Sequence, residues 1–274
     1  MRVAVERITG TAVMALVVTA HLVTPGQVAA QSANPYELSK YREWSLSIAG
    51  AGLLAAGLVV QGNQEPLTQD EIEELDPNDV NSFDRSATEE WSTGADMASD
   101  LLVLTLIASP AVMAVAESQS GGRLTLGVMY AETILLNNGV VQLLKGVTER
   151  TRPFAYNDDP EIPQEKKEQT NTRRSFPSGH TANAFAAAVF LGSTYSKLHP
   201  ESSARKWIWA GSLTAATAVG YFRYKAGKHF PTDIITGAAI GAAFGYIVPK
   251  LHETGVVYVS PVEGGAALGT VLRF

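Results

Sequence analysis

The sequence lacks cysteine and is poor in charged residues, and both deficits narrow what the protein can be. Without cysteine among its 274 residues, the chain has neither a disulfide framework nor a thiolate metal site. Charged residues make up 18% of the chain, which is low for a soluble protein. The mean hydropathy of +0.04 is nevertheless low for a chain made mostly of membrane-spanning helices. Composition therefore leaves the membrane question open.

Positive charge is also in deficit, because 21 Lys and Arg residues face 27 Asp and Glu residues, for a net charge of -6. Nucleic-acid binding favours a basic surface, so we expect no nucleic-acid partner. The length allows one large domain or two small ones.

The N-terminus has the features of an export signal. Early arginines are followed by an apolar stretch at 11–23 and by small residues at 28–30 that resemble a cleavage site. We therefore predict a signal peptide over residues 1–30, with an uncleaved anchor helix as the alternative. In either case residue 31 would lie outside the cytoplasm.

Six apolar segments rich in alanine, leucine and glycine predict helices, because none alternates strictly between apolar and polar residues. They are residues 44–60, 101–116, 124–144, 181–193, 207–221 and 234–248. Each is near or below the ~20 residues needed to cross a bilayer. Glu132 interrupts the third segment: in a membrane span it would be a functional candidate, and in a soluble bundle it would be a satisfied core carboxylate or lie on a wet face.

The connecting segments have distinct characters. Residues 64–90 are strongly acidic, and Thr68 with Glu71 predicts a capping box at the start of a short helix. The charged segment 154–174 predicts a loop that overhangs a site. In the tail, apolar residues 256–259 and 267–274 flank a turn at 260–265, which predicts a β-hairpin.

Three clusters in the second half of the chain share one chemical theme. The first runs from Lys145 to Arg152 and Pro153, the second is Phe176-Pro-Ser-Gly-His180, and the third runs from Arg223 through His229 to Asp233. A phosphate ester carries close to two negative charges, so its cleavage needs positioned positive charge. The cations Lys145, Arg152 and Arg223 would supply it.

The remaining cluster residues complete a phosphoryl-transfer site. Ser178, Gly179 and His180 precede an apolar helix, where free backbone N–H groups and the helix dipole favour an anion. His180 could there protonate a leaving oxygen. His229 lies four residues before Asp233, a spacing that can bring the carboxylate beside the imidazole and expose the other ring nitrogen for attack.

Together these motifs resemble the type 2 phosphatidic acid phosphatase family, which includes bacterial class A acid phosphatases and vanadium haloperoxidases. The family pattern is Lys-x6-Arg-Pro, Pro-Ser-Gly-His and Ser-Arg-x5-His-x3-Asp, and the resemblance covers about residues 84–249. One position departs from it, because Phe222 stands where the family usually has serine. That departure bears on local packing more than on chemistry.

The resemblance implies a role for each motif residue. Lys145, Arg152, Ser178, Gly179 and Arg223 would bind phosphate. His229 would be the nucleophile that forms a phosphohistidine, with His180 as general acid and Asp233 as the partner that orients His229. No metal and no cofactor are implied. The other histidines, His21, His199 and His252, match none of the motifs.

The fold expected from the resemblance is an all-α helical bundle of the acid phosphatase and haloperoxidase type, to which the tail adds a short C-terminal β-hairpin. We expect the signal peptide at 1–30, an N-terminal helix and acidic loop at 31–83, the phosphatase helical domain at 84–250 and the hairpin tail at 251–274.

All three clusters must face one compartment, which constrains topology. If residue 31 lies outside and all six segments cross a membrane, Lys145 would emerge in the cytoplasm, whereas membrane members of the resembled family have their site on the outer face. Either segment 44–60 packs without crossing, leaving five spans, or the chain after the signal is a soluble or peripheral domain. Both arrangements place the site in the periplasm.

The function expected is a metal-independent phosphatase for phosphate monoesters or diphosphates. A lipid substrate of the phosphatidic acid or polyprenyl diphosphate type is favoured over a soluble phosphate ester, and membrane association is expected with it. Arg173 and Arg174 could hold a second phosphate or could belong to a solvated loop. A vanadium-dependent haloperoxidase and a degenerate binding protein are the other classes of protein that remain.

Overall fold

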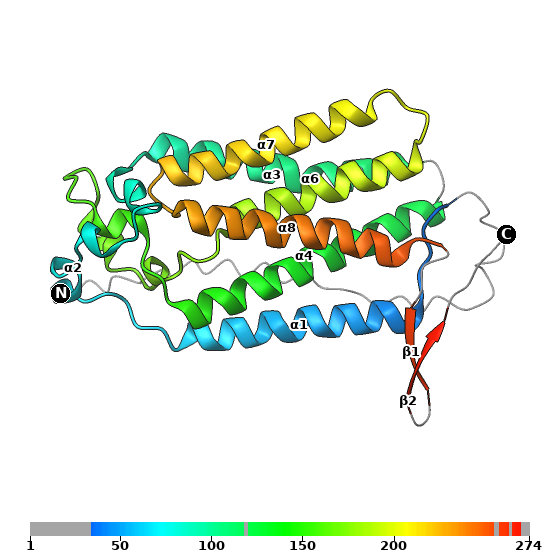
Figure 1. Ribbon diagram of the computed structural model, residues 1–274, viewed down its shortest axis with the longest axis horizontal. Helices are drawn as coiled ribbons and strands as arrows, with labels where there is room; N and C mark the ends of the chain where they lie inside the picture. The colour runs from blue at the N-terminus through cyan, green and yellow to red at the C-terminus, as the bar shows by residue number, and fades with distance from the viewer. Residues whose placement is uncertain (1–33, 118–119, 255–257, 263–264, 270–274) are drawn as a thin grey trace, which may run out of the picture. The chain divides into compact units, whose positions relative to one another are not determined.

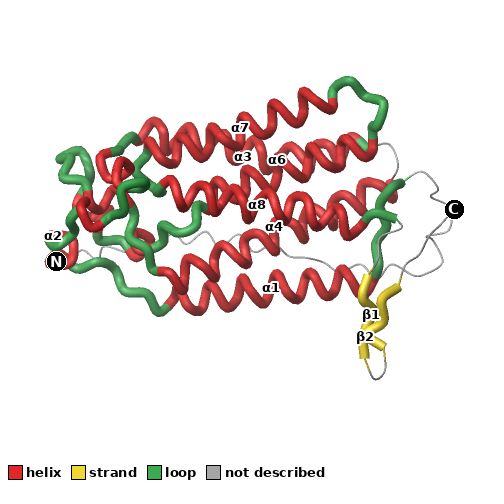
Figure 2. Tube along the Cα trace, in the orientation of Figure 1, coloured by secondary structure: helices red, strands yellow, loops and turns green. Residues whose placement is uncertain are grey.

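The structure is a computed structural model that describes residues 34–117, 120–254, 258–262 and 265–269. The predicted signal peptide at residues 1–30 lies outside this described part. Figures 1 and 2 show that the described chain is dominated by long helices.

Each predicted helix is present and is longer than predicted. The long helices are α1 (Lys40–Gly62), α3 (Thr93–Ala116), α4 (Ser120–Thr148), α6 (Gly179–Leu198), α7 (Arg205–Lys225) and α8 (Pro231–His252). The short helices are α2 (Gln69–Glu73) and α5 (Gln164–Lys167), together with the 3-10 helices η2 (Pro77–Asp79), η3 (Arg85–Glu89), η4 (Pro153–Tyr156) and η5 (Thr170–Arg173). The predicted capping box of Thr68 and Glu71 opens α2 and is confirmed.

Local capping explains why the helices extend past their apolar stretches. The Ser92 hydroxyl accepts a hydrogen bond from the Ala95 N–H at the start of α3, and Ser178 does the same for Thr181 at the start of α6. Proline at the first position of α8 suits a helix start, because that N–H would have no partner inside the helix. The apolar pattern reports only the packed turns, whereas caps add polar turns at the ends.

The six long helices run between two common ends. Near the start of the described chain, Tyr36 pairs with Glu253, just past the end of α8. At the other end of α1, the Gln64 side chain donates to the carbonyl oxygens of Lys145 and Gly146 near the end of α4. We call the end with Lys145 the site end and the end with Glu253 the far end. α1, α4 and α7 run toward the site end, and α3, α6 and α8 run away from it (Figure 1).

Helix α6 lies at the centre of the bundle, where it packs against α3, α4, α7 and α8. Three glycines four residues apart on α8 allow the closest of these contacts. A Cβ at Gly237, Gly241 or Gly245 would lie 2.5, 2.0 or 2.6 Å from a backbone oxygen of α6. Because no side chain separates the two backbones there, the α6 and α8 N-termini are held side by side.

Helix α1 also packs closely against α4 at glycine positions. A Cβ at Gly50 would meet Leu135 and Leu136, and one at Gly57 would meet Leu143 within 2.5–2.9 Å. Going along both helices, Gly146 faces Val60. The two helices are therefore parallel and in contact over much of their length.

The outer faces of the bundle are apolar. Four helical segments are long and apolar enough to cross a membrane by length and composition, namely Lys40–Gly62, Thr93–Ala116, Gly122–Tyr156 and Pro231–His252. In the first, second and fourth, less than a third of the most apolar stretch is buried in the structure. Large side chains such as Ile48, Leu101, Val115 and Ile235 are more than half exposed. Apolar surface of this extent marks a contact with a partner or a lipid phase.

The fold class needs one correction, because the predicted C-terminal β-hairpin is wrong as an element of the fold. The bundle is all-helical, and among the described residues no strand forms part of it. In the tail, the short strands β1 (Tyr258–Val262) and β2 (Gly265–Gly269) pair antiparallel with each other. The predicted boundaries are wrong as well, since β1 runs through residues expected in the turn; residues 256–257 and 270–274 lie outside the described chain.

The glycine contact between α6 and α8 gives a first prediction. Gly241→Ala should destabilise the protein by about 1–3 kcal/mol, because the new methyl group forces the two backbones apart. Gly211→Ala is the matched control, since a Cβ at Gly211 in α7 meets nothing within 4 Å. It should be neutral or stabilising by up to about 1 kcal/mol. Thermal unfolding in detergent measures both, and equal melting temperatures would contradict the packing argument.

Candidate active site

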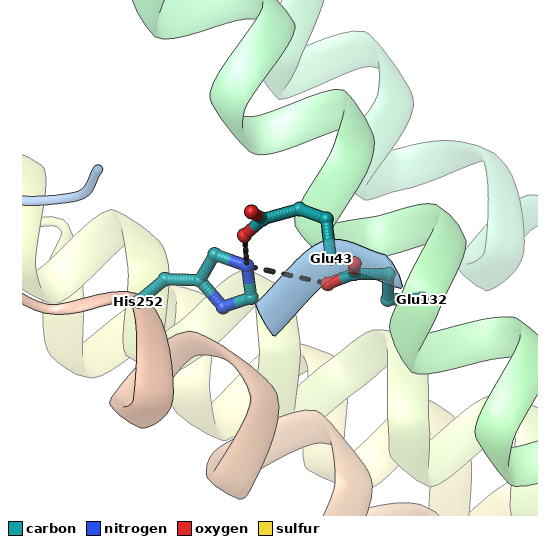
Figure 3. Close-up of side chains that lie close together, drawn as sticks. All are labelled: Glu43, Glu132 and His252. Carbon is teal, nitrogen blue, oxygen red and sulfur yellow. Dashed lines mark ion pairs between the residues drawn. The ribbon is translucent and has the colours of Figure 1, made fainter. Parts of the chain in front are cut away.

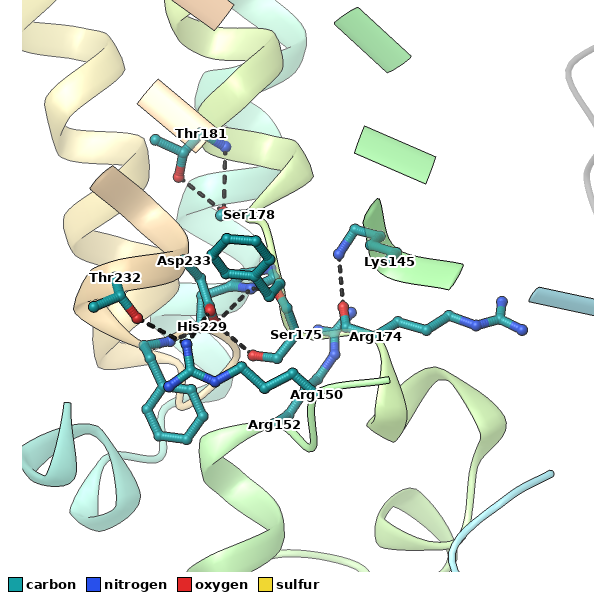
Figure 4. Close-up of polar contacts among 12 residues, drawn as sticks. Lys145, Arg150, Arg152, Arg174, Ser175, Ser178, Thr181, His229, Thr232 and Asp233 are labelled. Atoms are coloured by element: carbon teal, nitrogen blue, oxygen red, sulfur yellow. Dashed lines mark hydrogen bonds and ion pairs between the residues drawn. The ribbon is translucent and has the colours of Figure 1, made fainter. Parts of the chain in front are cut away.

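The structure brings the three predicted clusters together at the site end of the bundle. Lys145 lies in the last turn of α4, His180 in the first turn of α6, Arg223 near the end of α7, and Asp233 in the first turn of α8. His229 lies in the short connection between α7 and α8. Figure 4 shows Lys145, Arg152, Ser178, His229 and Asp233 grouped around the ends of these helices. All the predicted site residues therefore come from one region of the molecule.

His229 is buried and has a fixed orientation. Its Nδ1 lies 2.7 Å from the carbonyl oxygen of Ser175. Because a carbonyl only accepts, Nδ1 must be the donor, which leaves the lone pair of a neutral ring on Nε2. The pKa of His229 lies well below its ordinary value because of burial, with Lys145, Arg152, Arg223 and His180 adding to the effect. The imidazole is thus neutral at pH 7 and surrounded by cations.

Asp233 acts on His229 less directly than the sequence suggests. Its Oδ2 lies 3.6 Å from Nδ1 of His229, which is too far for a good hydrogen bond. The same oxygen accepts from the Ser175 hydroxyl at 2.5 Å and from the Phe230 N–H at 2.9 Å. Asp233 therefore holds Ser175, whose carbonyl in turn holds the imidazole.

Arg150 joins this network from the opposite side. Its guanidinium donates to Asp233 Oδ1 at 2.6 Å and to Asp84 Oδ2 at 2.7 Å, and it lies over the Phe230 ring at 4.1 Å from the centroid. Asp84, which is fully buried, also accepts from the N–H and hydroxyl of Thr232. Burial raises the pKa of Asp84, but the bonds from Arg150, Thr232 and Asn81 outweigh burial and leave it below the ordinary value.

Lys145 and Arg152 are buried cations without an acidic partner. Lys145 Nζ donates to the carbonyl oxygen of Arg174 at 2.6 Å. Arg152 donates to the backbone and side-chain oxygens of Asn171 at 3.0 and 2.7 Å. Neither forms an ion pair with a carboxylate within the described chain. A buried cation is costly unless an opposite charge compensates it, so these two residues favour a bound anion.

Arg223 and His180 do have acidic partners, which come from α3. Arg223 Nη1 lies 2.6 Å from Asp96 Oδ1, and His180 Nε2 lies 2.8 Å from Asp100 Oδ1. Arg223 is nevertheless incompletely bonded, because its buried Nε has no hydrogen-bond partner among the described residues. The carboxylates of α3 would have to share these groups with a bound phosphate.

Lys228 adds a fourth cation beside this pair of acids, with Nζ 3.0 Å from Asp96 Oδ2. Burial lowers the pKa of Lys228 to about 7, although Asp96 acts in the opposite direction. The charge on this lysine therefore depends on pH in the neutral range and on whether a further anion lies nearby.

The predicted phosphate ligands Ser178 and Gly179 lie at the N-terminus of α6, where the Ser178 side chain serves the helix. The buried Ser178 hydroxyl lies 2.9 Å from the Thr181 hydroxyl and caps the helix. A Cβ at Gly179 would lie 3.7 Å from Lys145 Cε, so the glycine keeps the space beside Lys145 open. What this segment can offer an anion is its backbone N–H groups.

The loop arginines behave differently from each other. Arg173 pairs with Glu71 at 2.5 Å, which occupies its charge. Arg174 donates to the side-chain oxygen of Gln64 and to the carbonyl oxygen of Gln61, both at 2.8 Å, so it has only neutral partners in these bonds. Phe222, at the position that departs from the family pattern, is partly buried beside Arg223.

Sequence reasoning missed several residues of the site: Asp84, Asp96, Asp100, Arg150, Ser175 and Lys228. Three of them had a signal, because Arg150, Ser175 and Lys228 lie within or beside the clusters. The acids had none, since they lie 45 or more residues before the first cluster and reach the site only through the packing of the bundle.

Comparison with known protein families agrees with the three motifs. The sequence model of the PAP2 superfamily matches residues 126–256, a range that contains all three clusters. Over that range, which is a little under half of its length, the chain is similar to the PAP2 superfamily.

Several curated proteins with similar sequences are phosphatases by name. An undecaprenyl-diphosphatase of Sulfolobus acidocaldarius is 28% identical over 134 residues, which is 49% of this chain and 57% of the relative. A probable diacylglycerol pyrophosphate phosphatase 1 of Schizosaccharomyces pombe is 32% identical and covers 36% and 39% of the two chains. A lipid A 1-phosphatase of Porphyromonas gingivalis is 35% identical over 71 residues, which is 26% of this chain and 15% of the relative. The chain thus spans little more than half of the first relative and less of the others.

A solved PAP2 structure gives a further comparison. A transmembrane PAP2-type phosphatidylglycerolphosphate phosphatase from Bacillus subtilis aligns over 77% of this chain and 92% of its own, with 20% identity and a TM-score of 0.42.

The Arg150 network gives the second prediction. Arg150→Gln should lower the free energy of unfolding by about 3 kcal/mol at neutral pH, because two buried carboxylates lose their shared cation. Since Asp84 has a depressed pKa in the folded state, its contribution is present above its ordinary pKa of 3.8 and is lost as the pH falls through the folded value. The difference from wild type should therefore shrink in acid.

Urea unfolding at neutral and acidic pH measures this effect. Arg85→Gln is the matched control, because Arg85 donates only to the carbonyl oxygens of Asn78 and Val80. A loss of stability that is equal for both variants, or that is independent of pH, would contradict the assignment.

Proposed function

We propose that this protein is a phosphatase that hydrolyses phosphate monoesters or diphosphates at the site end of the bundle. The observation that carries the proposal is the set of buried cations Lys145, Arg152 and Arg223 around a neutral histidine. Two of these cations have no carboxylate partner in the described structure. Buried positive charge of this kind suits a dianionic group whose charge shifts as the ester bond breaks.

The proposed reaction has two steps. In the first, Nε2 of His229 attacks phosphorus, the bond to the ester oxygen breaks, and His180 gives its proton to that oxygen. In the second, water attacks the phosphohistidine, its proton passes to His180, and the bond from phosphorus to Nε2 breaks. Ser175 and Asp233 keep Nδ1 as the donor throughout. Lys145, Arg152, Arg223 and the N-terminus of α6 would hold the phosphate oxygens.

We further propose a lipid phosphate or diphosphate as the substrate. The curated relatives are named for an undecaprenyl diphosphate, lipid A and a diacylglycerol pyrophosphate, which are all lipids. The apolar outer faces of α1, α3 and α8 suit a protein surrounded by the same phase as its substrate. Arg174, which has no carboxylate partner in the described part of the chain, is the candidate for a second phosphate.

We also propose that the bundle crosses a membrane with the site facing the periplasm. Helix α1 lies beside α4, so a membrane that contains α4 also contains α1, and six helices cross rather than five. α6 needs no apolar outer surface of its own, because its neighbours surround it. Basic residues lie at both ends, so the periplasmic orientation rests on the resemblance to the phosphatase family; those of the far end are Lys40, Arg42, Lys197, Arg205, Lys206 and Lys250.

This topology conflicts with the predicted signal peptide. Asn34 lies at the far end, near Glu253, so a periplasmic site would place Asn34 in the cytoplasm. A signal peptide at residues 1–30 would instead leave residue 31 outside. A membrane-crossing bundle with a periplasmic site therefore excludes the predicted signal peptide. The signal peptide is compatible with a periplasmic site only if the bundle does not cross the membrane.

The third prediction concerns the nucleophile. His229→Ala should lower turnover by at least about a thousandfold on a lipid phosphate, and wild type but not this variant should form an acid-labile phosphoenzyme. His199→Ala is the control, because His199 is exposed and outside the site. Turnover that is retained in His229→Ala would exclude His229 as nucleophile. Hydrolysis of a soluble aryl phosphate in parallel measures substrate class, and a preference for it would contradict the lipid proposal.

The fourth prediction concerns topology and uses the absence of native cysteine. Ser82→Cys lies in an exposed loop of the site end, and Ser203→Cys lies in an exposed loop of the far end. In right-side-out vesicles, a membrane-impermeant maleimide should label the cysteine at 82 and leave the one at 203 unlabelled. Labelling of both would indicate a peripheral bundle, and labelling of only 203 would place the site in the cytoplasm.

A further inference from the structure

A second polar cluster lies at the far end of the bundle, away from every residue of the proposed active site. It consists of Glu43 in the first turn of α1, Glu132 inside α4 and His252 in the last turn of α8 (Figure 3). The nearest ligand-type atoms of the three side chains all lie within 4.8 Å of one another. Along α8 alone, His252 is separated from Asp233 by roughly 30 Å, at 1.5 Å per residue. The proposed phosphatase chemistry has no use for this cluster.

The cluster is deeply buried and short of hydrogen bonds. Glu132 is 3% exposed and His252 is 0% exposed. Both carboxylate oxygens of Glu132, Oε2 of Glu43 and Nε2 of His252 have no hydrogen-bond partner in the described residues. Buried polar atoms are almost always hydrogen-bonded, so four such atoms at one place indicate a ligand that satisfies them together.

The geometry around His252 is that of ligands to one centre. Nε2 lies 3.0 Å from Glu43 Oε1 and 3.2 Å from Glu132 Oε2, yet neither contact has the direction of a hydrogen bond. The two oxygens therefore lie beside the nitrogen rather than in line with its N–H. Ligand atoms about 2.0–2.1 Å from a tetrahedral ion lie about 3.3 Å from one another, close to both separations.

The surroundings of the cluster orient its members. Nδ1 of His252 donates to the carbonyl oxygen of Val248 at 2.8 Å, which leaves Nε2 as the atom facing the carboxylates. A histidine that binds a metal commonly donates its other N–H to a backbone carbonyl in this way. Arg42 donates to Glu43 Oε1 at 2.9 Å and to the carbonyl oxygen of Leu251 at 2.9 Å. It holds Glu43 through Oε1, the same oxygen that lies 3.0 Å from His252, while Oε2 has no hydrogen-bond partner among the described residues.

We propose that Glu43, Glu132 and His252 form a binding site for a divalent transition-metal ion of the Zn²⁺ type. One imidazole and two carboxylates are a donor set that such ions accept, whereas Mg²⁺ and Ca²⁺ favour all-oxygen sites. The two carboxylates offer a dication two negative charges, one of which is shared with Arg42. Glu43, whose side chain is 17% exposed, marks the route by which the ion enters.

The bound ion would cross-link three helices at the far end of the bundle. Its ligands come from the start of α1, the body of α4 and the end of α8, and no two of them share a helix. An ion that binds the folded state and not the unfolded chain stabilises the fold by mass action. The role is structural, so the rate of the phosphatase reaction should not depend on it.

The experiment is titration calorimetry of the chelator-treated, full-length protein in detergent with Zn²⁺. We expect one high-affinity equivalent that raises the melting temperature, and none with Mg²⁺ or Ca²⁺. The isosteric variants Glu132→Gln and Glu43→Gln should bind this equivalent at least about tenfold more weakly, and His252→Ala should lose it. His199→Ala, which removes an exposed histidine elsewhere, should bind as wild type does.

Zn²⁺ binding by the variants distinguishes a metal site from a cluster of ion pairs. Turnover by the same variants shows whether the cluster acts on the active site. Zn²⁺ binding that is the same in wild type, Glu132→Gln and Glu43→Gln would overturn the proposal, as would the absence of binding to wild type. Should His252→Ala fail to fold, the two isosteric variants decide. Because the ligands lie far from His229, turnover in Glu132→Gln should equal that of wild type, whichever way the phosphatase proposal is resolved.

Discussion

The direct contact between the backbones of α6 and α8 is the constraint on which the rest of the site end depends. Gly237, Gly241 and Gly245 let α8 approach the carbonyl oxygens of α6 with no side chain between them. The Ser178 N–H then donates to the carbonyl oxygen of Asp233 at 3.0 Å. That bond ties the start of α6 to the start of α8, so the candidate phosphate cradle and the candidate nucleophile move as one piece.

Charge is distributed unevenly around that piece. Lys145 and Arg152 face neutral oxygens, while Arg223 and Lys228 face Asp96 of α3. Arg150, which lies between Lys145 and Arg152 in sequence, forms ion pairs with Asp84 and Asp233. Cations from one short segment thus have two different tasks. Arg150, which has a carboxylate on either side, stabilises the fold, and Lys145 and Arg152, which have none in the described structure, are available to an anion from solution.

Sequence alone predicts the parts of this arrangement that depend on local pattern. The six long helices follow from apolar composition, and the clusters follow from motif spacing, as at Lys145 and Arg152. It fails where the deciding partner is distant, because Asp84 and Asp96 have no local feature that ties them to His229. It also overstates the contact of His229 with Asp233, since a spacing of four residues does not reveal that the Ser175 carbonyl accepts the hydrogen bond from Nδ1. Counting the hairpin as part of the fold has the same origin, because the tail sequence does not show that the two strands pair only with each other.

The two ends of the bundle pose the same physical problem with opposite sign. At the site end, buried cations exceed the acids that face them, and at the far end the buried carboxylates Glu43 and Glu132 share one histidine and Arg42. Isolated buried charge is unstable in a low-dielectric environment, so each end favours a ligand of the opposite charge. A phosphate would satisfy the first and a metal ion the second. Because α4 and α8 extend to both ends, these two helices carry residues of both candidate sites.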